Sequence, residues 1–368
     1  MFIRNEVSKR IAILRPLLII GVVFVHVPGI ADQPSELVPS FFNWFAAFFK
    51  NGVFRGTVPT MSLIAGFLLF SAGLDQAPGK LFRKKFGSLV IPFIVFNLLC
   101  LFFMATVNQF IGPAFPGLHN WPTGLGRQLA LVFGIDEFPI NGPLHFVRDM
   151  IVTMLFVPLL GIVIRKAPWI GFAALALVFG TDMDGHLIFR ASSLLLFYIG
   201  GVAAVYRWNL LAFDRYAKQC LAILAVICLA IVGLRIDDNT VLVLAAPFLI
   251  WPATSLCNGT RLQAWAMRLS PYSFFIFAAH MPLIGLVWWY VKVHARWLPY
   301  PLVWLGIPVL ICAVLIKTFD LATRLAPRAF NFVIGARLRQ RTAERRKVQR
   351  AAGAPIYSPE LRATLFNS

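Results

Sequence analysis

Long apolar runs separated by short polar segments dominate the chain. A helix needs about 20 mostly apolar residues to cross the hydrocarbon core, and fewer where the bilayer thins. Ten runs meet this standard or approach it, and the fifth is the shortest: residues 11–30, 52–72, 87–108, 144–164, 168–180, 187–206, 219–234, 240–257, 271–293 and 300–319. The pattern therefore predicts an all-α integral membrane protein with a bundle of about ten transmembrane helices.

The distribution of lysine and arginine orients this bundle. Ten crossings place both termini on one side, and the termini and loops of that side hold 25 of these residues, against six on the other side and three within or at the ends of runs. Because cytoplasmic loops carry the excess of basic residues, we expect both termini in the cytoplasm. We further expect a transmembrane domain over residues 1–330 and a basic cytoplasmic tail over 331–368, held to anionic membrane lipid.

Composition supports the membrane assignment. The 368 residues are 59% hydrophobic and 13% charged, which excludes a soluble enzyme. The net charge of +19 does not predict nucleic-acid binding, because the basic residues lie in short clusters between apolar runs. The five cysteines show no metal-ligand spacing, so no metal site is predicted. The basic N-terminus leads into a run without a small-residue cleavage site, which indicates an uncleaved first helix.

Two predicted outer loops are long. Residues 31–51 include an aromatic stretch at 40–49, typical of an interfacial helix. Residues 109–143 are rich in glycine and proline, contain Trp121, Asp136 and Glu137, and suit an external binding cleft. An ordinary connector with aromatic anchors explains each loop equally well.

Ionisable side chains within a membrane span mark functional candidates, because burying them is costly. In the first run, Arg15 and His26 lie eleven residues apart, which places them on one helix face about 16 Å apart. Pro16 suits the first position of a helix. Arg15 would then lie at a positive helix N-terminus near the cytoplasm, a natural seat for phosphate. The alternative for His26 is packing or an interhelical hydrogen bond.

The fourth run begins with His145, Arg148 and Asp149, which are helix neighbours at spacings of three and four. They form either part of a site or a structural ion pair. Arg55 lies in the outer turn of the second run, and His280 lies near mid-membrane in the ninth. Together these residues describe a polar cavity that opens outward, with Arg15 at its cytoplasmic floor.

A basic cluster of Arg83, Lys84 and Lys85 precedes the third run on the cytoplasmic side. Anchoring by the positive-inside rule explains it, and holding an anionic substrate is the functional alternative. The chain has no P-loop, no GxSxG elbow and no HExxH motif. Chemistry based on histidine, or transport, therefore remains.

The arrangement resembles acyltransferase family 3, the ten-helix bacterial membrane O-acyltransferases that modify carbohydrates. The resemblance covers about residues 8–320. It depends on the Arg15–His26 spacing and on four stretches in the family's order, at residues 54–59, 62–69, 142–149 and 272–280. The chain departs from the pattern at His145, where many members carry tryptophan, and at Ser88, where some carry a second arginine.

The resemblance implies a cell-membrane enzyme that takes an acyl group, succinyl or acetyl, from cytoplasmic acyl-CoA (succinyl-CoA or acetyl-CoA). The acceptor is a polysaccharide or a lipid-linked oligosaccharide on the periplasmic side. By this reading His26 is the general base and acts with Arg148 and Asp149. The residues that bind the donor are Arg15, Arg83, Lys84 and Lys85, and those that bind substrate are Arg55, His145 and His280.

Two other classes compete with this interpretation. Intramembrane histidine, arginine and aspartate also mark proton-coupled transporters, so a secondary transporter or a flippase of a glycan precursor is the alternative. Many transporters have two related halves with matched broken helices, and no such pair is evident here. A structural scaffold would leave Arg15 and His26 unexplained.

Overall fold

The computed structural model describes residues 2–111, 124–135, 137–181 and 187–335, and within these ranges all regular structure is helical. Expected features at Trp121, at Asp136 and in the tail beyond residue 335 lie outside the described residues. The main helices are α1 (Phe2–Val25), α2 (Phe41–Ala47), α3 (Thr57–Ser71), α4 (Pro78–Lys85), α5 (Ile91–Ile111), α6 (Leu125–Phe133), α7 (His145–Lys166), α8 (Pro168–Thr181), α9 (Ala191–Val205), α10 (Ala217–Gly233), α11 (Thr240–Ala253), α12 (Arg261–Leu269), α13 (Ser273–His294), α14 (Tyr300–Leu325) and α15 (Pro327–Val333).

Shorter helical turns complete the chain between these helices. They are η1 (Pro34–Glu36), η2 (Phe48–Gly52), η3 (Val53–Gly56), η4 (Leu74–Gln76), η5 (Phe86–Val90), η6 (Gly142–Leu144), η7 (Asp214–Tyr216) and η8 (Thr254–Cys257). Of these, η2 and η5 are π-helical turns, a form that appears mostly as single-turn bulges within longer helices.

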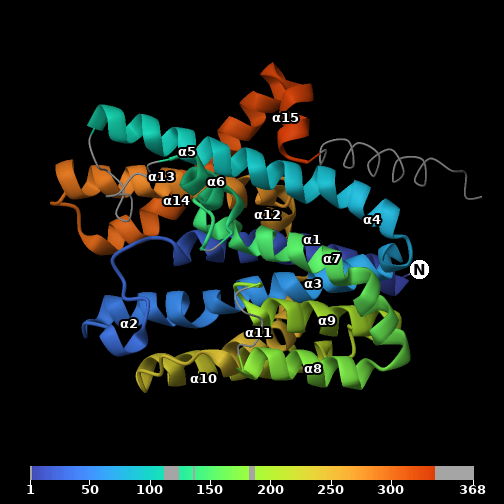
Figure 1. Ribbon diagram of the computed structural model, residues 1–368. Coiled ribbons are helices and arrows are strands. Elements are labelled where there is room, and N and C mark those ends of the chain that lie inside the picture. Colours follow the sequence, from blue (N-terminus) through green and yellow to red (C-terminus); the bar gives the residue numbers. More distant parts are fainter. Residues whose placement is uncertain (1, 112–123, 136, 182–186, 336–368) are drawn as a thin grey trace, which may run out of the picture.

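Seven helical segments in the described ranges are long and apolar enough to cross a membrane. Several combine consecutive elements, as Phe41–Ser71 joins α2 to α3 and Pro78–Ile111 joins α4 to α5. Helices α8 and α9 are apolar but shorter, and the 24-residue α1 carries more charge. The protein is thus an all-helical, multi-pass membrane protein. Most of its helices lie roughly side by side along one direction (Figure 1).

The aromatic stretch at residues 40–49 is helical from Phe41 onward. Ser40 caps α2 by accepting the backbone N–H of Asn43 at 3.0 Å, and the helical path continues through η2 and η3 into α3. The helical segment that could form the second span therefore extends from Phe41 to Ser71. Its extra turns pack against the core, because Ala46 and Ala47 are fully buried.

The expected helix start at Pro16 is also wrong. Helix α1 runs without interruption from Phe2 to Val25 with Pro16 inside it, so the proline forgoes only one backbone hydrogen bond. The first turns are held in place by Arg10, which pairs with Asp214 at 2.5 Å and lies over the ring of Trp251. Arg15 therefore lies in the interior of a helix, without the free N–H groups of a helix N-terminus.

Glycine allows α3 and α9 to pack with their backbones in contact. A Cβ atom on Gly66 would collide with the carbonyl of Phe197, and one on Gly200 would collide with the carbonyl of Leu63. Small residues are used in this way where membrane helices approach closely. The α3–α9 contact is therefore intolerant of any larger side chain.

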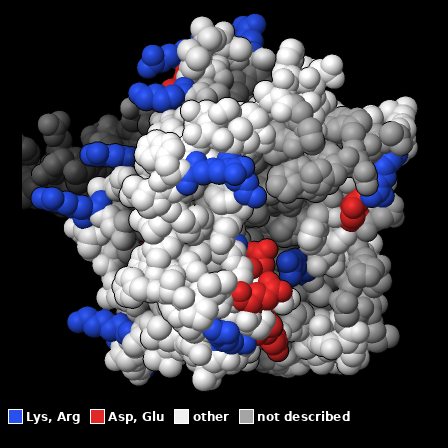
Figure 2. Space-filling view, turned by 90° about the vertical axis from the view of Figure 1, so that its left-hand side faces the viewer, with Lys and Arg blue, Asp and Glu red and all other residues white. Residues whose placement is uncertain are grey.

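Figure 2 shows the end of the bundle at which α2 lies, where acidic side chains gather near the middle of the face. At this end the loop before α2 meets the loop after α10, because Asp237 accepts hydrogen bonds from the backbone and hydroxyl of Ser35 at 2.9 and 2.6 Å. These bonds stabilise the carboxylate and lower the pKa of Asp237. The N-terminus lies at the opposite end (Figure 1).

Candidate functional site

The C-terminus of α1 positions His26. Helix α1 ends at Val25, and Pro28 follows three residues later, as is common just after a helix C-terminus. The backbone N–H of His26 turns to the carbonyl of Val23 at 3.3 Å, and ring Nδ1 lies 2.7 Å from the carbonyl of Val22. The imidazole thus satisfies a carbonyl that a helix end would otherwise leave unpaired.

The loop after His26 is fixed from α14. The hydroxyl of Tyr300 donates to the carbonyl of Pro28 at 2.8 Å. Gly29 adopts a φ of +105°, and a side chain there would run into the Tyr300 ring. The sequence Pro28-Gly29 therefore forms a turn beneath an aromatic ring, directly beside the histidine.

His280 of α13 lies against His26. Its side chain is completely buried. Its Nδ1 lies 3.1 and 2.9 Å from the carbonyls of Ile276 and Phe277, and its Nε2 lies 3.4 Å from Nδ1 of His26. The two ring centroids are 5.2 Å apart. The structure therefore brings together two histidines that lie 254 positions apart in the sequence.

A basic clamp from the Phe41–Ser71 segment holds the chain beyond His26. Buried Lys50 donates to the carbonyl of Ile30 at 2.6 Å and pairs with the carboxylate of Asp32 at 3.0 Å. Asn51 and Arg55 donate to the carbonyl of Asp32 at 2.8 and 3.0 Å. Lys50, Arg55 and Asp32 are also close enough to act electrostatically on His26. Arg55 is thus near the histidine pair, as predicted, but one of its nitrogens already holds the loop.

His145 lies at the start of α7 on the same side of the bundle. Its Nδ1 is 2.9 Å from the carbonyl of Gly142, and its ring packs on Phe138 with centroids 5.0 Å apart. His26 and Arg190 both act on it electrostatically. His145 thus belongs to the same polar region as His26, Arg55 and Arg190, and its hydrogen bond is to the backbone rather than to Arg148 or Asp149.

Arg148 and Asp149 connect α7 to two loops. Arg148 donates to the carbonyls of Gly134, at 3.1 Å, and Leu187. Its guanidinium also lies 3.4 Å from Asp149 and 4.3 Å from the centre of the Phe189 ring. Buried Asp149 accepts the backbone N–H groups of Phe189 and Arg190, each at 3.1 Å, just before α9 begins. The predicted pair therefore exists, and Asp149 also holds the chain just before α9.

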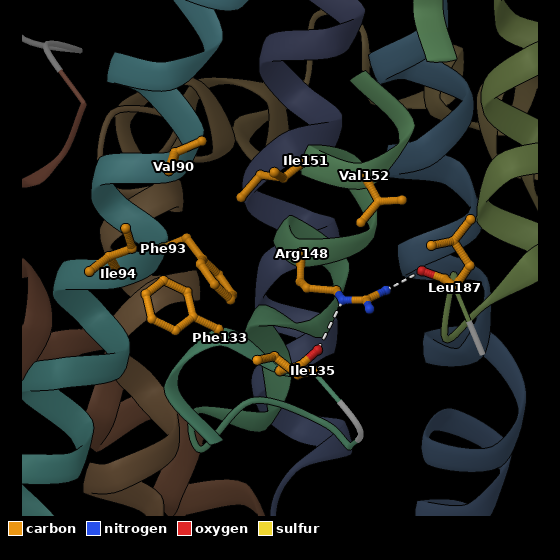
Figure 3. A pocket seen from close by; sticks show the side chains of 10 residues that line it. Val90, Phe93, Ile94, Phe133, Ile135, Arg148, Ile151, Val152 and Leu187 are labelled. Atoms are coloured by element: carbon orange, nitrogen blue, oxygen red, sulfur yellow. Dashed lines mark hydrogen bonds between the residues drawn. The ribbon is translucent and has the colours of Figure 1, made fainter. Parts of the chain in front are cut away.

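A cleft of about 660 Å³ lies beside Arg148, between α5 and α7 (Figure 3). Residues 133–135, within the predicted loop at 109–143, line part of it. Except for Arg148, the side chains that line it are apolar: Val90, Phe93, Ile94, Phe133, Ile135, Ile151, Val152 and Leu187. The cleft thus combines an apolar wall with one guanidinium.

The predicted donor-binding residues lie apart from the histidines. Arg15 is exposed on α1, and Arg83 and Lys84 are exposed at the end of α4, with Lys85 less so. Helix α4 lies near the end of the bundle that holds the N-terminus (Figure 1). In the described part of the chain, no three His, Cys, Asp or Glu side chains gather as a metal site would require.

Two buried asparagines near the site were not predicted. Asn141 donates from Nδ2 to the carbonyl of Ala278 at 2.8 Å, and its backbone N–H donates to Asn97 at 3.1 Å. The Ala278 carbonyl is available because Pro282, four residues later, has no N–H. A proline inside an apolar run near an intramembrane amide was the signal in the sequence.

Comparisons with known proteins identify the family of this chain. The acyltransferase-domain family matches residues 9–318, so the chain belongs to this family of acyltransferases.

Among known proteins, the chain is 30% identical to the succinoglycan biosynthesis protein ExoH of Rhizobium meliloti (strain 1021) over 373 residues, which cover 97% of this chain and 99% of that protein. The stretch at residues 10–28 is itself similar to a succinoglycan protein of rhizobia, and the comparison confirms this resemblance. No solved structure matches the chain.

Proposed function

We propose that this acyltransferase spans the inner membrane of a bacterium about ten times with both termini in the cytoplasm. It transfers an acyl group, succinyl or acetyl, from cytoplasmic acyl-CoA to a hydroxyl of an exopolysaccharide or another surface glycan. The relative's name, a succinoglycan biosynthesis protein, supports the class of acceptor. The observation that carries the proposal is the partly buried contact between His26 and His280 at the far end of α1 from its basic N-terminus.

In this proposal His26 is the general base. Its imidazole takes the proton of the sugar hydroxyl while the hydroxyl oxygen bonds to the carbonyl carbon of the thioester. The tetrahedral intermediate then breaks its C–S bond, and the departing thiolate takes the proton from His26. The positive charge of Arg55, near His26, stabilises the developing oxyanion. It also suits an anionic acyl group such as succinyl.

The two substrates approach from opposite ends. Arg15, Arg83, Lys84 and Lys85 supply the cationic side chains that bind the phosphates of CoA. The acceptor lies toward His145 and Arg148. The cleft beside Arg148 suits the hydrocarbon part of a lipid-linked oligosaccharide, because its lining is apolar and its guanidinium pairs with a phosphate. Asp149 fixes the loop before α9 that forms part of this region.

Release of free thiol from acyl-CoA, measured with the purified protein in lipid nanodiscs and a glycan acceptor, tests the proposal. We expect turnover in the native protein and a 10²- to 10⁴-fold loss in His26→Ala, about the contribution of a general base. His294→Ala is the matched control, because His294 is exposed at the end of α13 and stacks on Tyr290. Transport or flipping without thioester consumption would overturn the assignment.

A further inference from the structure

His280 is completely buried, and its polar contacts are an unusual set. Its Nδ1 lies against two backbone carbonyls of its own helix, and its Nε2 lies against Nδ1 of His26. Nδ1 of His26 in turn lies 2.7 Å from the carbonyl of Val22. The two rings thus form a continuous chain of contacts that ends on a backbone carbonyl at each side.

The carbonyls determine where the protons lie. A carbonyl only accepts, so a hydrogen bond to Ile276 or Phe277 requires the proton of His280 on Nδ1. Its Nε2 is then a lone pair that faces His26. By the same logic the Val22 carbonyl requires the proton of His26 on Nδ1, where it also faces Nε2 of His280. A neutral His26 therefore carries its free lone pair on Nε2.

We propose that His280 is a positioning residue that holds His26 in the Nδ1–H tautomer, so that Nε2 is the atom that removes the proton from the acceptor. The inference rests on the proposed function and identifies the reacting nitrogen within it. During transfer the sugar proton moves to Nε2 of His26, the new C–O bond replaces the C–S bond, and the same proton leaves with the thiolate. His280 keeps its own proton throughout.

The same contact stabilises the charge that forms. Protonated His26 donates from Nδ1 both to the last turn of α1 and to Nε2 of His280, and the C-terminus of a helix favours a positive charge. Protonated His26 needs this stabilisation, because Lys50, Arg55 and His145 lie around it. Among the described groups that act on His26, the negative charge that opposes them comes from Asp32. The neutral Nε2 of His280, which accepts from Nδ1 of His26, thus has the role that a carboxylate has in serine hydrolases.

Three variants test the proposal in the full-length protein in nanodiscs. His280→Leu removes the acceptor but keeps apolar volume. His280→Gln restores an oxygen that can accept from Nδ1 of His26. His294→Leu changes a histidine on the same helix that is remote from the pair. We expect His280→Leu to lower kcat about 100-fold with an unchanged KM for acyl-CoA. We expect the kcat of His280→Gln to be at least tenfold higher than that of His280→Leu.

Two readouts separate positioning from folding. Loss of the acceptor destabilises protonated His26, so the acidic limb of the pH–rate profile should move to lower pH in His280→Leu and return toward its native place in His280→Gln. Native kcat and an unmoved profile in His280→Leu would overturn the proposal. Equal losses in both His280 variants, with reduced protein yield, would also overturn it and indicate packing alone.

The tautomer is measurable without turnover. Solid-state NMR of protein labelled with ¹⁵N-histidine distinguishes a protonated ring nitrogen from a bare one, and His26→Gln assigns the signal. We expect protonated Nδ1 and bare Nε2 for His26 in the native protein. In His280→Leu, where the Val22 carbonyl alone still holds the proton on Nδ1, we expect a larger share of the Nε2–H tautomer. A native Nε2–H tautomer would overturn this inference and leave the acyltransferase proposal standing, whereas absent thioester consumption would overturn the function itself.

Discussion

At the scale of single residues, backbone carbonyls hold the polar side chains inside this bundle more than opposite charges do. His26, His280, His145, Lys50 and Arg148 each lie within hydrogen-bonding distance of a carbonyl. Apart from those beside His280, which lie within α13, these carbonyls lie at helix ends or in loops. Inside a membrane such carbonyls must find donors from the protein. The side chains that mark the site are therefore also part of what satisfies the backbone around it.

Arg15 differs from these residues, because it is exposed on a continuous helix. If it binds a CoA phosphate, Arg15→Lys keeps the charge but loses the planar fork that grips phosphate with two hydrogen bonds. We expect Arg15→Lys to raise the KM for acyl-CoA more than it lowers kcat, and Arg15→Ala to do so more strongly.

Steady-state kinetics in nanodiscs measure both constants. The control is Arg324→Lys, another basic residue of a long helix that no role is assigned to. An unchanged KM with a collapsed kcat would place Arg15 in the chemical step instead, and native values in both variants would leave it as a topology signal.

The sequence predicted the residue types of the site better than their partners. Intramembrane histidines and arginines are conspicuous because they are costly to bury. However, helix spacing reports only neighbours within one helix, so it suggested that His145 faces Arg148 and Asp149. The structure instead turns these two toward the loops at Gly134 and at 187–190, which local periodicity cannot reveal. The pairing of His26 with His280 is tertiary in the same way.

At the scale of helices, apolar runs located most elements but not their ends. Every one of the ten runs coincides with a helix, yet α2 and η2 extend the second run backward and α9 begins only at Ala191. Ser40 caps α2, and Asp149 holds the backbone of residues 189 and 190 just before α9. Ser40 signals a cap in the sequence, whereas Asp149 acts from another helix.

The α3–α9 contact gives a prediction at this scale. Gly66→Ala places a methyl group against the Phe197 carbonyl, and overpacking of this kind costs about 1–3 kcal/mol. We expect a lower melting temperature in detergent and reduced activity. Gly306→Ala in α14 is the control, because its Cβ would meet open space and alanine favours a helix by about 1 kcal/mol. Equal melting temperatures for the two variants would contradict the close backbone contact.

The cleft between α5 and α7 gives a second prediction at the scale of helices. Ile151 lines it, so Ile151→Trp should fill part of its volume. We expect acylation of a lipid-linked acceptor to fall about tenfold while a water-soluble oligosaccharide is still acylated at the native rate. Leu155→Trp is the control, because Leu155 is 63% exposed on the same helix. A comparable loss with both acceptors would show that the cleft does not hold the lipid.

At the scale of the whole molecule, charge asymmetry predicts the orientation. With both termini in the cytoplasm, a cytoplasmic fluorescent protein fused after Phe330 should be active, and alkaline phosphatase fused at the same place should be inactive. Paired fusions of alkaline phosphatase and a cytoplasmic fluorescent protein measure this, with fusions in the loop at residues 234–239 as the opposite control. Phosphatase activity after Phe330 would show that the bundle has one crossing fewer than predicted and that the proposed direction of acyl transfer is reversed.

The chain of contacts through His26 and His280 ends on backbone carbonyls at both sides, and this bears on whether protons can cross the membrane there. Val22 at one end and Ile276 and Phe277 at the other accept hydrogen bonds but hand no proton onward. In the proposed mechanism, a proton that His26 takes up at Nε2 therefore finds no onward acceptor among the described contacts of the two rings. We therefore expect these two imidazoles to add no path for protons across the membrane.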